Sequence, residues 1–171
     1  MEFYIVYNKN TGQEMTRGQG PFGAAASQTL LPEDMTTMVV SQAVFYSYPL
    51  DLEAIRASAA AQIDNSAEQI RLRFLTAGAG QAITYTAKVE EAKAFQANNN
   101  ALTPFLSAEA NAIGVTIEAL ATEVLAKAAE WTTIGARIEG ARMGAKTQLG
   151  KAANLAEIAT ATEIDWATVL A

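Results

Sequence analysis

The stretch IEALATEVLAKAAEWTTIGARIEGARMGAKTQLGKA, residues 117–152, decides the fold class of this chain. Apolar residues recur along it every seven positions, and others follow three positions after several of them. This spacing puts them on one side of an α-helix and is typical of a helix that pairs with other helices. The series, called the seam below, is Ile117, Val124, Trp131, Ile138, Ala145 and Ala152, joined by Leu120, Ile134 and Ala141.

The same stretch contains glycines at positions 135, 140, 144 and 150. Each lowers helix propensity by about 1 kcal/mol relative to alanine, so the glycines need a structural reason. Close approach of a neighbouring helix, in the same chain or in another, is the favoured reason, and a break near Gly140 or Gly144 is the alternative. The sequence therefore predicts a long helix with a helix-binding side, and it leaves the source of the partner helix open.

Helical periodicity continues on both sides of the seam. Apolar residues spaced three and four apart mark further helices, with Thr103-Pro104 as a start signal and Gly114 as a stop signal. The first helix is expected to begin at Asp51, whose carboxylate can accept open amides, and to end in the stretch Thr76-Ala77-Gly78-Ala79-Gly80. The predicted helices lie near 51–75, 81–97, 104–113 and 117–152, followed by a short C-terminal helical tail that packs back onto them.

The N-terminal part has a different character. Residues 3–7 are aromatic or β-branched, and the Asn and Gly residues of 8–12 suit a tight turn, so a β-hairpin with a returning strand at 13–17 is expected. A second β element is predicted at 37–40, with 44–46 as its partner strand.

These patterns define the fold class and the division of the chain. We predict an α+β fold that is mainly α, with a small N-terminal antiparallel sheet followed by a helical bundle or long-helix region. The expected domains are a β-rich region at 1–48 and a helical domain at 49–171.

Composition excludes several classes of function. The chain has no cysteine and no histidine, which removes disulfides, thiolate metal sites and the commonest general base. The net charge of −6 opposes nucleic-acid binding, which relies on lysine and arginine at phosphates. No run of about 18 apolar residues is present, and the apolar part of MEFYIVYNKN is too short for a signal peptide. We expect a soluble, non-enzymatic protein made in the cytoplasm, without cofactor, metal, nucleic-acid or membrane partner.

Two patterns resemble ligand or catalytic sites but have simpler interpretations. Gly18-Gln19-Gly20-Pro21-Phe22-Gly23 has the glycine spacing of a dinucleotide-binding loop. It lacks the acidic residue expected about 20 positions later, and Pro21 stiffens it, so it is interpreted as a turn. The carboxylate groupings are interpreted as solvated helix surface. They are Glu90 with Glu91, Glu118 with Glu123, and Glu163 with Asp165.

The candidate functional residues are those that would face other helices. Tryptophan and arginine are enriched at protein interfaces, although a core position for Trp131 and ordinary salt bridges for the arginines are the simpler explanations. The predicted interface residues, all from the long helix, are Ile117, Leu120, Val124, Trp131, Ile134, Ile138 and Arg142.

The chain resembles a family of poorly characterised proteins encoded among the tail and tail-fibre genes of tailed bacteriophages. The resemblance includes IRLRFLTAGAGQAITYTAKVEEAKAF, residues 70–95, and its most specific part runs from Arg71 to Phe95. The segment from Gly20 to Tyr48 departs most from the family pattern. Other shared stretches are YIVYNKNTG (4–12), PLDLEAIRASAAAQID (49–64) and EIDW (163–166).

The resemblance implies a structural component of a bacteriophage particle, associated with the tail or tail fibre and located in the virion. It implies other phage tail or fibre proteins as partners, a homo-oligomer with a trimer favoured by the three-fold symmetry of tail fibres, and no enzyme or cofactor. The alternative is a tail-fibre assembly chaperone that is not retained in the mature virion. An enzyme that uses carboxylates is a third class, which no carboxylate spacing supports.

Overall fold

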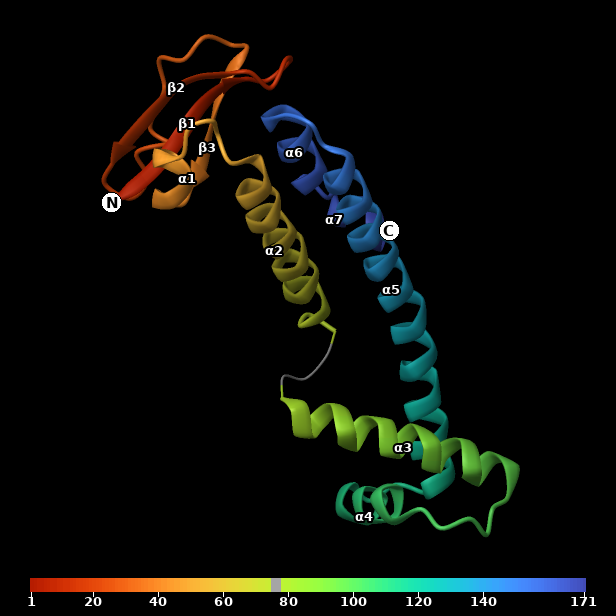
Figure 1. Cartoon of the computed structure of the whole chain (residues 1–171). Helices are drawn as coiled ribbons and strands as arrows, with labels where there is room; N and C mark the ends of the chain where they lie inside the picture. The colour runs from red at the N-terminus through yellow and green to blue at the C-terminus, as the bar shows by residue number, and fades with distance from the viewer. Residues whose placement is uncertain (75–77) are drawn as a thin grey trace. The chain divides into compact units, whose positions relative to one another are not determined.

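The computed structural model describes residues 1–74 and 78–171 (Figure 1). The predicted fold class is confirmed, because a small antiparallel sheet at the N-terminus is followed by helices. The strands are β1 (Glu2–Asn8), β2 (Glu14–Gly20) and β3 (Met35–Val40). The helices are α1 (Gln42–Tyr46), α2 (Leu52–Arg71), α3 (Ala79–Ala97), α4 (Pro104–Ile113), α5 (Ile117–Lys151), α6 (Leu155–Thr162) and α7 (Trp166–Leu170).

Most helix boundaries agree with local signals in the sequence. The Asp51 carboxylate accepts a hydrogen bond from the Ala54 amide at 2.9 Å, and Gly114 ends α4 with a left-handed φ of 74°. The Thr116 hydroxyl accepts from the Ala119 amide at 3.1 Å at the start of α5. Helix α2 ends at Arg71, and the predicted end at residue 75 and the Thr76-Ala77 part of the stop signal lie outside the described residues.

The sheet has the order β2-β1-β3, with both outer strands antiparallel to β1. The predicted hairpin is confirmed: the Asn8 side chain accepts hydrogen bonds from the amides of Asn10 and Thr11, and Gly12 has a φ of 70°. Strand β2 continues to Gly20, beyond the predicted end at residue 17. At Gly18 an added Cβ would lie 2.3 Å from the Tyr4 ring, so only glycine fits there.

The predicted strand at 44–46 is wrong, because these residues form α1. The Ser41 hydroxyl caps this helix by accepting from the Val44 amide at 3.3 Å, and the Val44 side chain is buried. Strand β3 pairs with β1 instead of with residues 44–46. A capped turn with one buried aliphatic residue has therefore overridden the β propensity of Val-Phe-Tyr.

The chain forms two compact units. The first unit contains Met1–Ala67, Gly140–Val169 and Ala171, and the second contains Glu68–Glu139 and Leu170. Both α2 and α5 contribute residues to each unit, so the unit boundaries lie inside helices and not at residue 48.

The core of the first unit joins the sheet to the helices. One face of β1 supplies Ile5 and Tyr7 to this core, and a smaller cluster of Tyr4, Val6 and Ala25 covers the other face. The sheet therefore shares a core with helices that follow it by more than a hundred residues in sequence. The remaining core residues are Val44 from α1, Ile55, Ala59 and Ile63 from α2, Ala145 and Leu149 from α5, Ala152, and Leu155, Ile158 and Ala161 from α6. The predicted packing of the C-terminal tail onto the helices is confirmed.

The second unit has a core built by α3, α4 and the start of α5. Its buried residues are Ala92 from α3, Leu106 and Ala110 from α4, and Leu120, Ala121 and Val124 from α5. Val89, Phe95, Ile117 and Leu125 pack against them.

Helix α5 is continuous from Ile117 to Lys151, so the predicted alternative of a break near Gly140 or Gly144 is wrong. At Gly140, Gly144 and Gly150, apart from the adjacent residues and the nearby backbone of α5 itself, no described heavy atom lies within 4 Å of where a Cβ would be. At Gly135 an added Cβ would lie 3.3 Å from the Trp131 ring of the same helix. Close approach of another helix of this chain therefore explains none of these glycines within the described structure.

Candidate protein-interaction surfaces

The first part of the predicted interface is covered by the chain's own helices. Leu120 and Val124 are buried in the core that α5 forms with α3 and α4, and Ile117 packs at its edge. These residues are brought together, but their apolar surface is already removed from solvent by α4 and α3. Their seam positions thus stabilise the second unit.

The middle of the seam is more open. From Ala126 to Arg137, none of the described side chains of α5 is fully buried. Trp131 and Ile134 are partly buried, and the indole of Trp131 lies along its own helix next to Gly135. Trp131 and Ile134 therefore keep apolar surface that a partner could cover.

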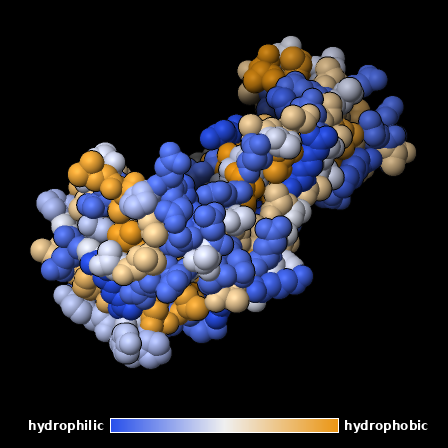
Figure 2. All heavy atoms as spheres, turned by 90° about the horizontal axis from the view of Figure 1, so that it is seen from above, coloured by the Kyte–Doolittle hydropathy of each residue, from blue (hydrophilic) through white to orange (hydrophobic). Residues whose placement is uncertain are grey.

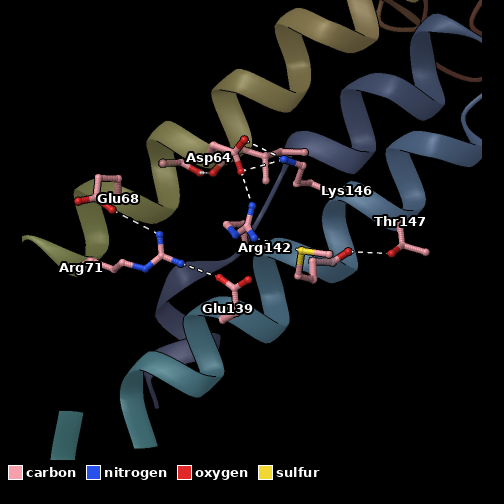
Figure 3. Close-up of polar contacts among 10 residues, drawn as sticks. Asp64, Glu68, Arg71, Glu139, Arg142, Lys146 and Thr147 are labelled. Carbon is pink, nitrogen blue, oxygen red and sulfur yellow. Dashed lines mark hydrogen bonds and ion pairs between the residues drawn. The ribbon is translucent and has the colours of Figure 1, made fainter. Parts of the chain in front are cut away.

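The last predicted interface residues have partners or are buried within the chain. Ile138 has no exposed surface. The guanidinium of Arg142 lies 2.5 Å from a carboxylate oxygen of Asp64 on α2, and the ammonium of Lys146 lies 2.8 Å from the other oxygen of the same carboxylate. Figure 3 shows both cations of α5 directed at Asp64. Arg142 thus ties α5 to α2 inside the first unit.

The ion pairs change the acidity of Asp64. Hydrogen bonds from Lys146 and then from Arg142 lower the pKa of Asp64 below its ordinary value of 3.8. A carboxylate whose folded-state pKa is lowered stabilises the fold above its ordinary pKa, and this stabilisation disappears as the pH falls through the lowered value. The contribution of Asp64 should therefore be complete at neutral pH and absent in strong acid.

An Asp64→Asn variant tests this assignment. We expect it to melt at a lower temperature than the unchanged protein at pH 7, and the difference should vanish as the pH is lowered below the ordinary range of aspartate. Thermal unfolding followed by circular dichroism between pH 2 and about pH 7 measures the difference. Glu130→Gln is the matched control, because Glu130 is exposed on α5 and forms no ion pair with any described residue. A difference that does not change with pH would contradict the role given to Asp64.

A second ion-pair group lies in the second unit. Arg71, at the end of α2, contacts Glu68 at 3.4 Å and Glu139 of α5 at 2.7 Å (Figure 3). Ordinary salt bridges are the simpler explanation for the arginines, and for Arg71 the structure agrees with it. Arg71–Glu139 links α2 to α5, whereas Arg71–Glu68 lies within α2. Both pairs are partly exposed to solvent, so each is expected to add little stability.

The structure gives the candidate carboxylates structural roles. Glu123 pairs with Lys127 at 2.6 Å, which lowers the pKa of Glu123 through the hydrogen bond from Lys127. Asp165 caps α7, where hydrogen bonds from the Thr168 hydroxyl and the Thr168 amide lower its pKa. Glu91 on α3 accepts hydrogen bonds from the amides of Phe105 and Leu106 at 3.1 and 2.9 Å.

Glu91 corrects the predicted cap of α4. Thr103 occupies the N-cap position, but its side chain makes no capping hydrogen bond and instead contacts Ser107. The open amides at this end of α4 are satisfied by the Glu91 carboxylate from a different helix, and a negative charge is also favoured at a helix N-terminus. Glu91 thereby holds α4 against α3.

A Glu91→Ala variant should destabilise the protein by about 1 kcal/mol, because replacing a capping side chain by alanine has that typical cost. Urea unfolding followed by circular dichroism measures the change. Glu90→Ala is the control, since Glu90 is exposed and pairs only with Lys93 among the described residues. Equal effects of the two substitutions would show that the cap from Glu91 adds nothing.

The glycine motif at 18–23 does not form a dinucleotide site. Gly18 and Gly20 lie in β2, and Gly23 lies in the turns that follow, with a φ of 87°. The next described helix is α1, after β3, so the loop does not open onto a crossover helix. The interpretation as a turn is right for residues 21–23 and wrong for Gly18 and Gly20, which are strand residues.

Residues 102–115 carry a second apolar surface, which the sequence patterns did not predict. Leu102 is 91% exposed just before α4, Phe105 and Ile113 on α4 are 46% and 58% exposed, and Val115 after α4 is also exposed. The opposite side of α4 is buried through Leu106 and Ala110. The sequence PFLSAEANAI of α4 has apolar residues on both sides of the helix. Helices of this kind are normally covered on both sides, so the pattern could have indicated a binding surface.

Hydrophobic residues also reach the surface elsewhere. Figure 2 shows separate hydrophobic patches, in orange, between hydrophilic side chains on the face drawn. Among the large exposed side chains are Phe22, Leu30, Tyr46, Tyr48 and Ile83. Surface apolar groups that occur singly are ordinary, whereas a cluster along one short segment such as 102–115 is typical of a protein-binding site.

Within residues 1–74 and 78–171, no three acidic side chains gather closely enough to hold a metal ion. None of the helices described there combines the length and the apolar character needed to cross a bilayer.

Comparison of the chain with models of known protein families, with curated proteins and with solved structures finds no match.

Proposed function

We propose that this protein is a structural component of a bacteriophage particle, associated with the tail or tail fibre, that acts by binding other protein chains. The proposal combines the resemblance of residues 70–95 and other stretches to tail-associated proteins with the surface of α4. It includes self-association, for which the partly open middle of the seam around Trp131 is a second contact surface.

The observation that carries the protein-binding part is the exposed side of α4. Phe105 and Ile113 expose apolar surface on a helix whose other side is already packed, and Leu102 adds an exposed side chain just before that helix. Water contact with apolar surface is unfavourable by about 25 cal/mol per Å², so covering this side with another chain releases free energy. An interface with an apolar centre of this kind suits a part that remains in an assembly.

Mass spectrometry of purified phage particles tests the proposal. We expect the chain among the virion proteins, in a fixed ratio to the tail or fibre proteins. Its absence from the particles would contradict a structural role. Absence combined with capture of a fibre protein from infected cells would instead identify an assembly chaperone.

Variants with changed residues on and next to α4 test whether this surface is needed for incorporation into particles. Leu102→Ser combined with Ile113→Ser should leave the fold intact, since both side chains are exposed, and should reduce incorporation into particles at least about tenfold, the factor that corresponds to 1.4 kcal/mol. Leu30→Ser is the matched control, because Leu30 is 97% exposed and lies in a loop of the first unit. Normal incorporation of the double variant would remove α4 from the proposal.

A further inference from the structure

One edge of the sheet is open and uncharged. Strand β3 is the last strand of the order β2-β1-β3. Within the described structure, the amides and carbonyls of Thr36–Val40 make no backbone hydrogen bond beyond their pairing with β1. Its sequence MTTMVV contains no charge and no proline, which are the usual devices that keep another strand from pairing with an edge. The other edge strand, β2, carries Glu14 and Arg17.

A cavity of about 70 Å³ lies beside this edge, inside the first unit. Met38, Val39 and Val40 all line it. Among the described residues, β3 is the only strand that lines the cavity, and neither β1 nor β2 contributes to it. The cavity therefore lies on the β3 side of the sheet, next to its open edge.

The far wall of the cavity comes from helices. Ala54, Ile55 and Ser58 of α2 form one part, and Ile158 and Thr162 of α6 form another. No charged residue lines the cavity. Its volume is several times the roughly 10–15 Å³ that one water molecule needs, so it accommodates an aliphatic side chain of moderate size.

We propose that the edge of β3 and this cavity form a binding groove for an extended, uncharged segment of another protein. The segment adds to the sheet as a fourth strand, paired with β3 through backbone hydrogen bonds, and places one aliphatic side chain in the cavity. The open amides and carbonyls require an extended backbone, the cavity requires an aliphatic group, and the uncharged lining disfavours a charged one. The groove is a surface distinct from α4.

Titration of the full chain, labelled with ¹⁵N, with a synthetic peptide tests the groove. The probe is Thr-Val-Leu-Val-Thr with an acetylated N-terminus and an amidated C-terminus. Amide resonances of Thr36–Ser41 and of Ser58 should shift on binding. A peptide with alternate backbone nitrogens methylated on its pairing edge keeps every side chain but loses the N–H donors, and it should bind at least tenfold more weakly.

Two variants of the chain complete the test. Ser58→Leu fills the cavity from an exposed position of α2 and should weaken peptide binding at least tenfold, while Ala61→Leu, on an exposed part of α2 outside the cavity lining, should not change it. Equal binding of the methylated peptide, no shifts in Thr36–Ser41, or an unchanged affinity of Ser58→Leu would each overturn the proposal. A dimer that Val39→Lys dissociates would also overturn it, because a second copy of this chain would then occupy the edge.

The peptide experiment is independent of the phage proposal. It uses the purified chain and makes no reference to particles, so its failure leaves the role of α4 untouched. Conversely, absence of the protein from virions would not change the binding of an extended peptide at β3.

Discussion

Replacing Ile138 by aspartate is expected to destabilise the protein by about 4 kcal/mol or more, a large part of the stability of an ordinary domain. Ile138 has no exposed surface on α5. An aspartate there either carries an unpaired charge away from water or remains protonated at neutral pH, and both are costly. Urea unfolding followed by circular dichroism should show a much lower midpoint, or an unfolded chain in buffer.

The same unfolding experiment distinguishes the buried and the partly buried positions of the seam by the stability that each substitution costs. Thr133→Asp is the control, because Thr133 is exposed on α5 and the two residues have similar helix propensity. Trp131→Asp should give an intermediate loss, since Trp131 is only partly buried. If Ile138→Asp were as mild as Thr133→Asp, the buried position of Ile138 in the isolated chain would be wrong. If Trp131→Asp alone changed the mass of an oligomer, the open middle of the seam would be its interface.

The parts of the fold that were predictable depend on neighbours in sequence. The hairpin follows from Asn8 and Gly12, which make their own turn, and α4 follows from Pro104 and Gly114 at its two ends. The α5 periodicity is equally local, because one helix face repeats without reference to the rest of the chain. Such signals need no knowledge of what packs against the element.

The parts that were not predictable depend on residues far apart in sequence. Asp64 meets Arg142 and Lys146 from a helix 78 and 82 positions later, and Glu91 caps a helix that begins after it. Periodicity marks a buried face but does not name the element that buries it. For this reason the seam of α5 predicted helix pairing correctly, yet could not show that α3 and α4 cover its beginning.

The sequence pattern also could not show which apolar residues are free to bind a partner. Each seam residue named as an interface could pack within the chain or between chains, and the described structure uses Leu120, Val124 and Ile138 internally. Other apolar side chains are more exposed than the seam, and they include Phe105 on α4 and Val39 on the edge of β3. A search for partners should therefore cover these two residues as well as the partly open middle of the long helix.

A distant side chain adds to the local cap that holds residues 44–46 in α1. Arg17 of β2 donates hydrogen bonds to the carbonyl oxygens of Val44, Phe45 and Ser47, the last at 2.7 Å. A helix leaves its final carbonyls without internal partners, and a cation there satisfies them and interacts favourably with the helix dipole. Glu14 holds the guanidinium in place at 2.5 Å and raises the pKa of Arg17 through this hydrogen bond.

An Arg17→Met variant is therefore expected to lose about 3 kcal/mol of unfolding free energy, because hydrogen bonds to charged groups contribute about 1.5–3 kcal/mol. The carbonyls of Phe45 and Ser47 would lose the guanidinium as their donor, whereas the Val44 carbonyl would keep the amide and the hydroxyl of Ser47. Without the guanidinium, residues 44–46 should leave the helical conformation. This change should disturb the cluster of aromatic rings in which the ring centroid of Phe45 lies 5.0 Å from those of Phe3 and Tyr46. Near-ultraviolet circular dichroism and the urea midpoint should change together.

Two further variants test the cause of that loss. Arg17→Lys keeps the charge but cannot reach several carbonyls with one ammonium as the planar guanidinium does, so we expect an intermediate midpoint. Arg73→Met is the control, since Arg73 is exposed and forms no ion pair with the described residues. A full rescue by lysine would assign the effect to charge alone. An unchanged aromatic signal in Arg17→Met would mean that Ser41 and the buried Val44 suffice to hold α1, and that the β propensity of residues 44–46 is overcome locally.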